Sequence, residues 1–208
     1  QAVAQARAWR ARGLQVPVSI NVSALQFQQP DFVDRVAQAL QAAELPPDML
    51  ELELTESILI KDAEDALHRL KALSQLGVML SIDDFGTGYS SLGYLKRFPI
   101  NRLKIDRSFV STLPDDDSDA AIVHAVIQLG RAMNLRVIAE GVETELQRQF
   151  LVEHGCDEFQ GYLFAPALDA SRFEDRLAAA APAPGSPSAI RMRAWPRATS
   201  SSVSSARE

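Results

Sequence analysis

Residues 81–91 read Ser-Ile-Asp-Asp-Phe-Gly-Thr-Gly-Tyr-Ser-Ser, and residues 103–110 read Leu-Lys-Ile-Asp-Arg-Ser-Phe-Val. Each stretch contains a short apolar run typical of a strand that ends in ionisable residues, and the first leads into a glycine-containing loop. Adjacent carboxylates at one strand end, followed by hydroxyl groups and by a lysine at the next strand end, suit a site for divalent metal ions and phosphate. These two stretches are the centre of the functional interpretation.

Outward from this centre, short apolar runs alternate with longer segments of helical spacing. The runs that predict strands lie at 16–20, 50–54, 78–82, 100–105, 135–139 and 157–163, the last one weak. The segments that predict helices lie at 1–13, 31–44, 61–76, 117–133, 143–154 and 170–180. Gly77 and Gly155 stand where helices should end, and Thr144 or Glu143 where one should begin. Repeated strand and helix units predict a parallel sheet with helices packed outside it.

Polar side chains fall at the carboxyl end of each predicted strand. They are Asn21, Glu53 with Glu56, Asp83 with Asp84, Lys104 with Asp106, Glu140, and Gln160. In a (β/α)8 barrel the carboxyl ends of all strands surround one mouth, where active sites are found. We therefore predict an α/β fold of the TIM-barrel type. Carboxylate and amide oxygens can hold one or two hard cations for metal-assisted phosphodiester hydrolysis, and a lysine can stabilise developing charge.

Composition limits the number of domains and the class of protein. The chain has 208 residues, of which 47% are hydrophobic, and a single cysteine, so one domain with a sizeable core in a reducing compartment is expected. It contains neither an apolar run of about 20 residues nor a signal-peptide pattern, which predicts a cytoplasmic protein with no membrane segment. Residues 181–208 are rich in Ala, Pro, Ser and Arg without apolar periodicity, and we predict a disordered tail after a domain at 1–180.

Charge argues against nucleic-acid binding. The net charge is −6, and the tail at 181–208 carries four arginines against one glutamate, so the acidity belongs to residues 1–180. Such a body is a poor general binder of DNA. An anionic ligand would have to be recruited by bound cations or local basic groups.

The polar motifs, in order and spacing, resemble those of the EAL-domain family of bacterial cyclic-di-GMP phosphodiesterases. The matching stretches are Asn21-Val22-Ser23, 51–57, 83–91, Lys104-Ile105-Asp106, 140–144 and Gln160-Gly161-Tyr162. The resemblance covers residues 1 to about 178 and implies a (β/α)8 fold that opens cyclic di-GMP to linear pGpG.

The resemblance also implies roles for individual residues. Asn21, Glu53, Asp83 and Asp84 would bind Mg²⁺ or Mn²⁺, with Asp83 bridging two ions, and Glu140 would be a further carboxylate of the metal site. Among the catalytic groups, Lys104 would contact the attacking water and Glu56 would steady the loop from Asp84 to Ser91. Gln160, Asp106 and Glu143 are assigned to cofactor binding around the same mouth.

Partners follow from the same resemblance. Cyclic di-GMP is the expected ligand, and a homodimer is expected through the loop after Asp84 and neighbouring helices. Because the chain starts with Gln1 in a helical segment, we expect it to begin inside a larger protein, with room for an upstream sensor or diguanylate-cyclase (GGDEF) domain.

One departure from the family concerns the Glu-Ala-Leu motif, which gives the family its name. In the family this motif lies upstream of the segment that resembles residues 1–13. The first two barrel strands and an arginine that contacts the substrate also lie in that upstream region. The glutamate of the motif is a metal ligand. The resemblance therefore implies an incomplete (β/α)8 barrel with about six of its eight strands in this chain, an incomplete ligand set and open barrel edges.

Alternative interpretations stand beside each assignment. The Asp83-Asp84 pair could simply begin a loop, Glu53 could face solvent, and Glu140 and Glu143 could complement a helix N-terminus. At the level of function, the alternatives to an active phosphodiesterase are a catalytically silent receptor for cyclic di-GMP and an inactive fragment of an enzyme. Intact Asp83 and Glu53 favour the enzyme over the receptor.

Overall fold

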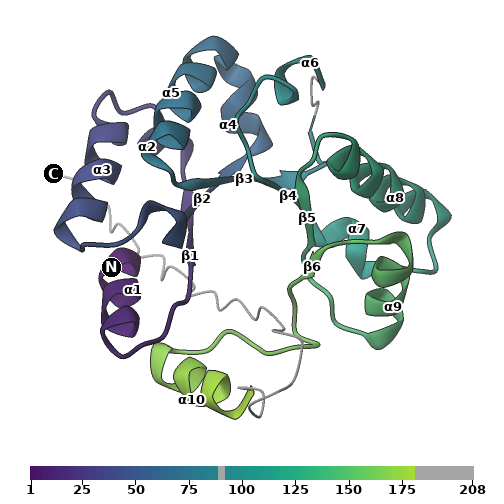
Figure 1. The fold of residues 1–208 in the computed structure, drawn as a ribbon. Coiled ribbons are helices and arrows are strands. Elements are labelled where there is room, and N and C mark those ends of the chain that lie inside the picture. Colours follow the sequence, from purple (N-terminus) through teal and green to yellow (C-terminus); the bar gives the residue numbers. More distant parts are fainter. Residues whose placement is uncertain (89–91, 181–208) are drawn as a thin grey trace, which may run out of the picture.

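The computed structural model describes residues 1–88 and 92–180. In this part of the chain, strands β1 to β6 form one parallel sheet in the order of the sequence, and the helices lie outside it (Figure 1). The strands are β1 (Val18–Val22), β2 (Leu50–Thr55), β3 (Met79–Phe85), β4 (Arg102–Ile105), β5 (Arg136–Ala139) and β6 (Glu158–Phe159). The α/β fold predicted from the sequence is confirmed.

Helices connect successive strands and cover the outer face of the sheet. They are α1 (Ala2–Ala11), α2 (Ala24–Phe27), α3 (Phe32–Ala42), α4 (Glu56–Lys61), α5 (Ala63–Leu76), α6 (Leu92–Leu95), α7 (Arg107–Ser111), α8 (Asp117–Ala132), α9 (Glu145–His154) and α10 (Ala170–Ala180), with a 3-10 turn at Pro47–Met49. Among the described helices, none is both long and apolar enough to cross a bilayer.

Period-two alternation in the strands determines which side chains face the helices. In β2, Leu50, Leu52 and Leu54 belong to the apolar core, and Glu51 and Glu53 alternate with them. Because successive strand residues point to opposite faces, the two glutamates lie on the concave side of the sheet. Each fully buried leucine stabilises the outer layer by about 1.5–3 kcal/mol. The core therefore lies between sheet and helices, and the concave side of β2 carries polar side chains.

The predicted helix boundaries are confirmed by their capping geometry. Gly77 ends α5 with φ +88° and Gly155 ends α9 with φ +78°, the left-handed conformation that glycine adopts without strain. Thr144 begins α9: its side chain accepts a hydrogen bond from the Gln147 N–H, while Gln147 reaches back to the Thr144 N–H.

The strand predicted at 157–163 is wrong in length, since β6 spans only Glu158–Phe159. After Phe159 the chain turns against the segment that follows β5, where Val142 N–H donates to the Gln160 carbonyl. A Cβ at Gly161 would lie 2.1 Å from the Val142 carbonyl oxygen, so this close approach requires glycine. The short helices α2, α4, α6 and α7 were also not predicted, because each spans only one or two turns and leaves little periodicity to detect.

The sheet is open between β1 and β6 within the described residues, and α10 lies on that side next to α1 (Figure 1). The Trp9 ring packs on Phe173 at a centroid distance of 5.2 Å, and Trp9 Nε1–H donates to Glu174 at 2.7 Å. Arg12 also binds the Glu174 carboxylate through two hydrogen bonds. These contacts join the two helices. The tail predicted at 181–208 lies outside the described residues.

Candidate metal centre

An irregularity at the end of β3 brings Asp83 and Asp84 into the same mouth. The register with β4 pairs Ile82 with Leu103 but Phe85 with Ile105, so the two aspartates stand in a bulge. Asp84 has φ +53°, a left-handed conformation that aspartate tolerates better than most residues. In a regular strand the two side chains would point to opposite faces. The bulge instead lets both carboxylates reach one site.

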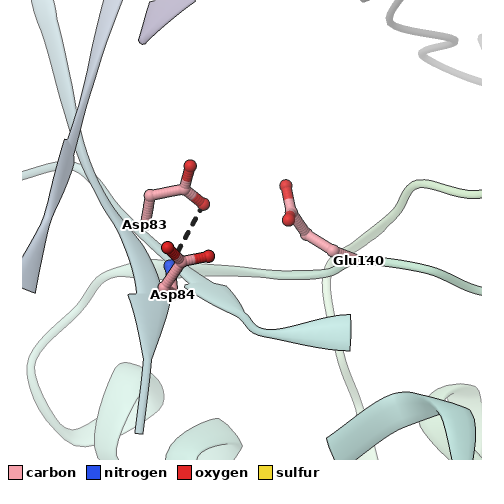
Figure 2. A group of neighbouring side chains, drawn as sticks. All are labelled: Asp83, Asp84 and Glu140. Atoms are coloured by element: carbon pink, nitrogen blue, oxygen red, sulfur yellow. Dashed lines mark hydrogen bonds between the residues drawn. The ribbon is translucent and has the colours of Figure 1, made fainter. Parts of the chain in front are cut away.

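Glu140 completes this acidic group from the end of β5. Figure 2 shows its carboxylate opposite those of Asp83 and Asp84, and one oxygen of each side chain lies within 4.8 Å of the others. The Asp84 N–H donates to Asp83 Oδ1 at 3.1 Å, and the Glu140 N–H donates to the Ile105 carbonyl at 3.1 Å. Strand ends far apart in sequence thus converge, as the barrel prediction requires.

Lys104 lies at the centre of the carboxylates. Its Nζ is 2.8 Å from Glu53, 2.9 Å from Asp83 and 2.5 Å from Glu140, and the side chain is 1% exposed. Burial alone would lower the pKa of Lys104, but the charges of Glu53, Glu140 and Asp83 outweigh it and raise the pKa above its ordinary value. The lysine is therefore a permanent cation at neutral pH.

The surrounding carboxyl groups carry more negative charge than Lys104 balances. Burial raises the pKa of Glu53 to about 7 in spite of the opposing lysine, and burial also raises the pKa of Glu140. The pKa of Asp84 is raised by burial and by the charges of Asp83 and Asp106. Such crowding favours uptake of either protons or a cation. Because the donors are all oxygens, the residues fit a hard divalent ion such as Mg²⁺ or Mn²⁺.

Asn21 and Gln160 flank this centre. Asn21 is the register partner of Glu53 and is exposed at the end of β1. Gln160 follows β6, with its N–H bound to the Ala139 carbonyl at 2.8 Å. Both residues stand at the carboxyl ends of their strands, and their binding roles stay predictions.

Glu56 lies below the loop that follows Asp84. It is buried at the start of α4 and accepts a hydrogen bond from the Gly86 N–H at 3.4 Å, and a Cβ at Gly88 would lie 3.2 Å from its Cδ. Its predicted role of steadying the loop stays a prediction. Residues 89–91 of that loop lie outside the described part of the chain.

Asp106 and Glu143 have local structural roles. Asp106 caps α7 by accepting from the Ser108 N–H at 3.0 Å; burial would raise its pKa, but the hydrogen bonds from Ser108 outweigh burial and lower it. Glu143 is exposed, and its backbone N–H donates to Gln147 in the cap of α9. The structure thus places the Glu143 backbone in the helix cap, and its cofactor role stays a prediction.

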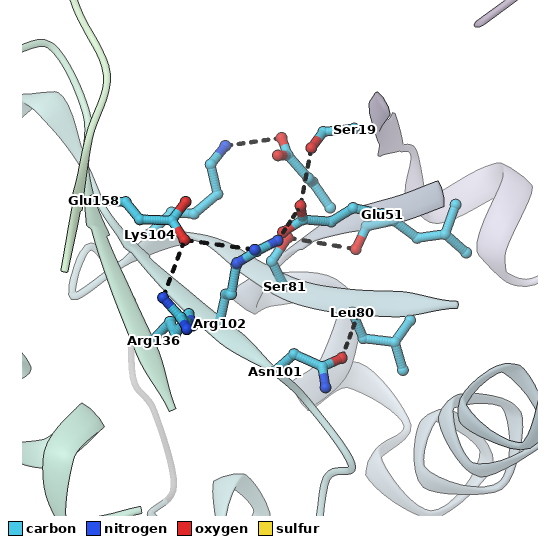
Figure 3. Close-up of polar contacts among 11 residues, drawn as sticks. Ser19, Glu51, Leu80, Ser81, Asn101, Arg102, Lys104, Arg136 and Glu158 are labelled. Atoms are coloured by element: carbon cyan, nitrogen blue, oxygen red, sulfur yellow. Dashed lines mark hydrogen bonds and ion pairs between the residues drawn. The ribbon is translucent and has the colours of Figure 1, made fainter. Parts of the chain in front are cut away.

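A second polar layer was not predicted from the sequence. Ser19, Glu51, Arg102 and Glu158 contact one another on the concave side of the sheet (Figure 3). Each of these residues stands two positions before a polar residue that was already assigned to the mouth. The alternation of leucine and glutamate in Leu50-Glu51-Leu52-Glu53 is the sequence pattern that could have predicted this layer.

Fold and site together define a domain of the TIM-barrel type with an oxygen-lined acidic centre at the carboxyl ends of its strands. The EAL domain family model matches residues 1–167. The chain therefore belongs to the EAL domain family, and the resemblance seen in the sequence motifs is confirmed.

Characterised relatives support this assignment. MucR of Pseudomonas aeruginosa, a bifunctional diguanylate cyclase/cyclic di-GMP phosphodiesterase, is 51% identical over 155 residues, which cover 74% of this chain and 23% of MucR. The solved structure of the PaMucR phosphodiesterase in complex with c-di-GMP has a TM-score of 0.81 and 48% identity, covering 83% of this chain and 70% of that chain. The EAL domain of Mycobacterium smegmatis DcpA gives a TM-score of 0.81 and 42% identity, covering 86% of this chain and 81% of that chain. The chain thus spans about a quarter of the length of such curated relatives.

Proposed function

We propose that this domain hydrolyses cyclic di-GMP to linear pGpG with the help of Mg²⁺ or Mn²⁺. The observation that carries the proposal is the convergence of Asp83, Asp84 and Glu140 around one point, beside a buried lysine. Relatives named as cyclic di-GMP phosphodiesterases, among them MucR, support the choice of substrate.

The proposed ligands of the cation are Asn21, Glu53, Asp83, Asp84 and Glu140. One or two divalent ions held by these residues would lower the pKa of water and neutralise phosphoryl oxygens.

Lys104 and Glu140 supply different chemistry. Because the neighbouring carboxylates raise the pKa of Lys104, the lysine serves as a protonated hydrogen-bond donor that stabilises developing negative charge. Burial raises the pKa of Glu140, so this carboxylate is a better proton acceptor than an exposed one. In the reaction a water oxygen bonds to phosphorus, the bond to the 3′ oxygen breaks, Glu140 accepts the proton that water loses, and the leaving 3′ oxygen takes up a proton from solvent to become a hydroxyl.

The wider setting is part of the proposal. A cytoplasmic location, a homodimer formed through the loop after Asp84, and an upstream sensor or diguanylate-cyclase domain each stay predictions. Bifunctional MucR, of which this chain matches 23%, is consistent with additional domains.

The test is the Asp83→Asn variant, with Asp175→Asn as the matched control. Asp83→Asn removes one charge from the metal centre and keeps the side-chain volume, whereas Asp175 is exposed on α10. In the full-length protein with Mn²⁺, we expect pGpG formation to fall by at least about 100-fold in Asp83→Asn and to be unchanged in the control. Near-normal turnover by Asp83→Asn would refute the proposal.

A further inference from the structure

A chain of buried polar contacts crosses the barrel interior one level below the metal centre. It consists of Ser19 on β1, Glu51 on β2, Arg102 on β4 and Glu158 on β6, and we call it the lower brace (Figure 3). Arg102 and Glu51 are 4% and 1% exposed, so this is an interior feature and not a surface ion pair. The function proposed above does not use it.

Arg102 is the hub of the lower brace. Its NH1 lies 2.6 Å from Glu51 Oε2, and its NH2 lies 3.5 Å from Glu158 Oε1. Ser19 Oγ–H donates to the same Glu51 oxygen at 3.1 Å. At the solvent side, Arg136 approaches Glu158 Oε1 at 3.8 Å. A planar guanidinium can direct several donors at once, which a lysine ammonium cannot do in the same geometry.

The two ion pairs of Arg102 join strands that are not neighbours in the sheet: β4 with β2 through Glu51, and β4 with β6 through Glu158. Between β2 and β4 lies β3, which places the small, fully buried Ser81 at this level; its hydroxyl donates to the Leu52 carbonyl at 3.5 Å. The lower brace thus sets a distance between strands that sheet hydrogen bonds fix only indirectly.

Each member of the lower brace is two residues before a polar residue of the mouth. Arg102 precedes Lys104, and Glu51 precedes Glu53, on the same faces of β4 and β2. Residues i and i+2 of a strand are about 6.6 Å apart, so a shift at the lower level is transmitted to the upper level with little loss. The Lys104–Glu53 contact of 2.8 Å repeats the Arg102–Glu51 contact one level higher.

We propose that Arg102 is a positioning residue for the reaction: through Glu51 and Glu158 it holds β2, β4 and β6 at the spacing that places Glu53 and Lys104 in the metal centre. This inference rests on the proposed function. Buried ion pairs contribute little net stability compared with well-packed apolar side chains of similar volume. A role in geometry and a role in stability can therefore be separated by experiment.

The experiment compares the full-length wild type with Glu51→Met/Arg102→Met, Arg102→Lys and the control Arg172→Met, whose ion pair with Asp169 is exposed. Thermal unfolding measures stability, electron paramagnetic resonance measures Mn²⁺ binding, and pGpG formation gives kcat and KM. For the double variant, in which Glu158 keeps its contact with the exposed Arg136, we expect an unfolding midpoint close to that of the wild type. We also expect a Mn²⁺ Kd raised about tenfold, and kcat lowered about tenfold with KM little changed. Arg102→Lys should show smaller losses in the same direction, and Arg172→Met should match the wild type.

The outcomes separate the lower brace from the proposed function. A double variant with wild-type midpoint, Mn²⁺ affinity and kcat would overturn the positioning role. If the double variant does not fold, Arg102→Lys decides: a folded Arg102→Lys protein with unchanged Mn²⁺ affinity and kcat would also overturn it. A wild type that neither binds Mn²⁺ nor forms pGpG would refute the proposed function, and the inference with it.

Discussion

Replacement of Lys104 by methionine tests the electrostatic account of the centre most directly. Methionine keeps most of the volume of the side chain but removes the cation that lies 2.5–2.9 Å from Glu53, Asp83 and Glu140. With the lysine 1% exposed, solvent cannot substitute for the lost charge. Removal of one partner from a buried ion pair typically costs about 3–5 kcal/mol, because the remaining charge is left uncompensated. We expect a loss of that size in the free energy of unfolding of the metal-free protein.

The same reasoning predicts a specific rescue by metal. A divalent cation neutralises the carboxylates that Lys104 no longer balances, and a ligand present at 100 times its Kd stabilises the native state by about 2.7 kcal/mol. Mn²⁺ should therefore stabilise Lys104→Met at least as much as it stabilises the wild type, while turnover stays low because the hydrogen-bond donor is missing.

The assay is urea unfolding of the wild type, Lys104→Met and the exposed control Lys71→Met, each in EDTA and in Mn²⁺. The control should stay within about 0.5 kcal/mol of the wild type. A Lys104→Met protein that loses less than about 1 kcal/mol in EDTA would refute the reasoning, since the carboxylates would then not depend on the lysine.

Two further predictions concern pH and the C-terminal helix. The pKa of Glu53, about 7 in the folded protein against 4.5 ordinarily, means that the native state binds more protons than the unfolded state between these values. Stability of the metal-free protein should therefore fall as pH rises from about 5 to 8, by up to about 3 kcal/mol from this group, and Glu53→Gln should flatten the urea-unfolding trend; parallel curves would contradict this. Truncation after Ala180 should leave the thermal midpoint unchanged, whereas Phe173→Ala should lose about 3 kcal/mol or more through its lost contact with Trp9. A large effect of truncation, or none of Phe173→Ala, would show that the tail and not α10 covers this side.

Much of the fold was predictable because its signals are local. Gly77, Gly155 and Thr144 mark helix boundaries through backbone conformation and capping, which depend only on neighbouring residues. The site was predictable in outline for a topological reason: parallel strands bring their carboxyl ends to one edge, so Asp83 and Glu140 had to converge. The end of β6 was not predictable, since it depends on the approach of Gly161 to Val142.

The geometry of the aspartate pair required the structure. Period-two alternation would place Asp83 and Asp84 on opposite faces, and the bulge that unites them arises from the register between β3 and β4. Register is a property of two strands and leaves no mark within either one. The left-handed backbone at Asp84 has the same origin.

The lower brace was not predicted for a different reason, which concerns the position of its residues along the strands. Glu51 and Arg102 stand near the beginning of their strands, whereas the polar residues expected from barrel topology stand at the carboxyl ends. Because the apolar core lies between the sheet and the helices, the concave side of each strand does not have to be apolar, and polar residues there can be selected for geometry. If Arg102 serves to position the metal centre, replacement of both Arg102 and Glu51 by apolar side chains should leave folding nearly intact and should impair the metal centre. A layer that positions the metal centre should affect metal binding and turnover more than stability, whereas a second core would affect stability first.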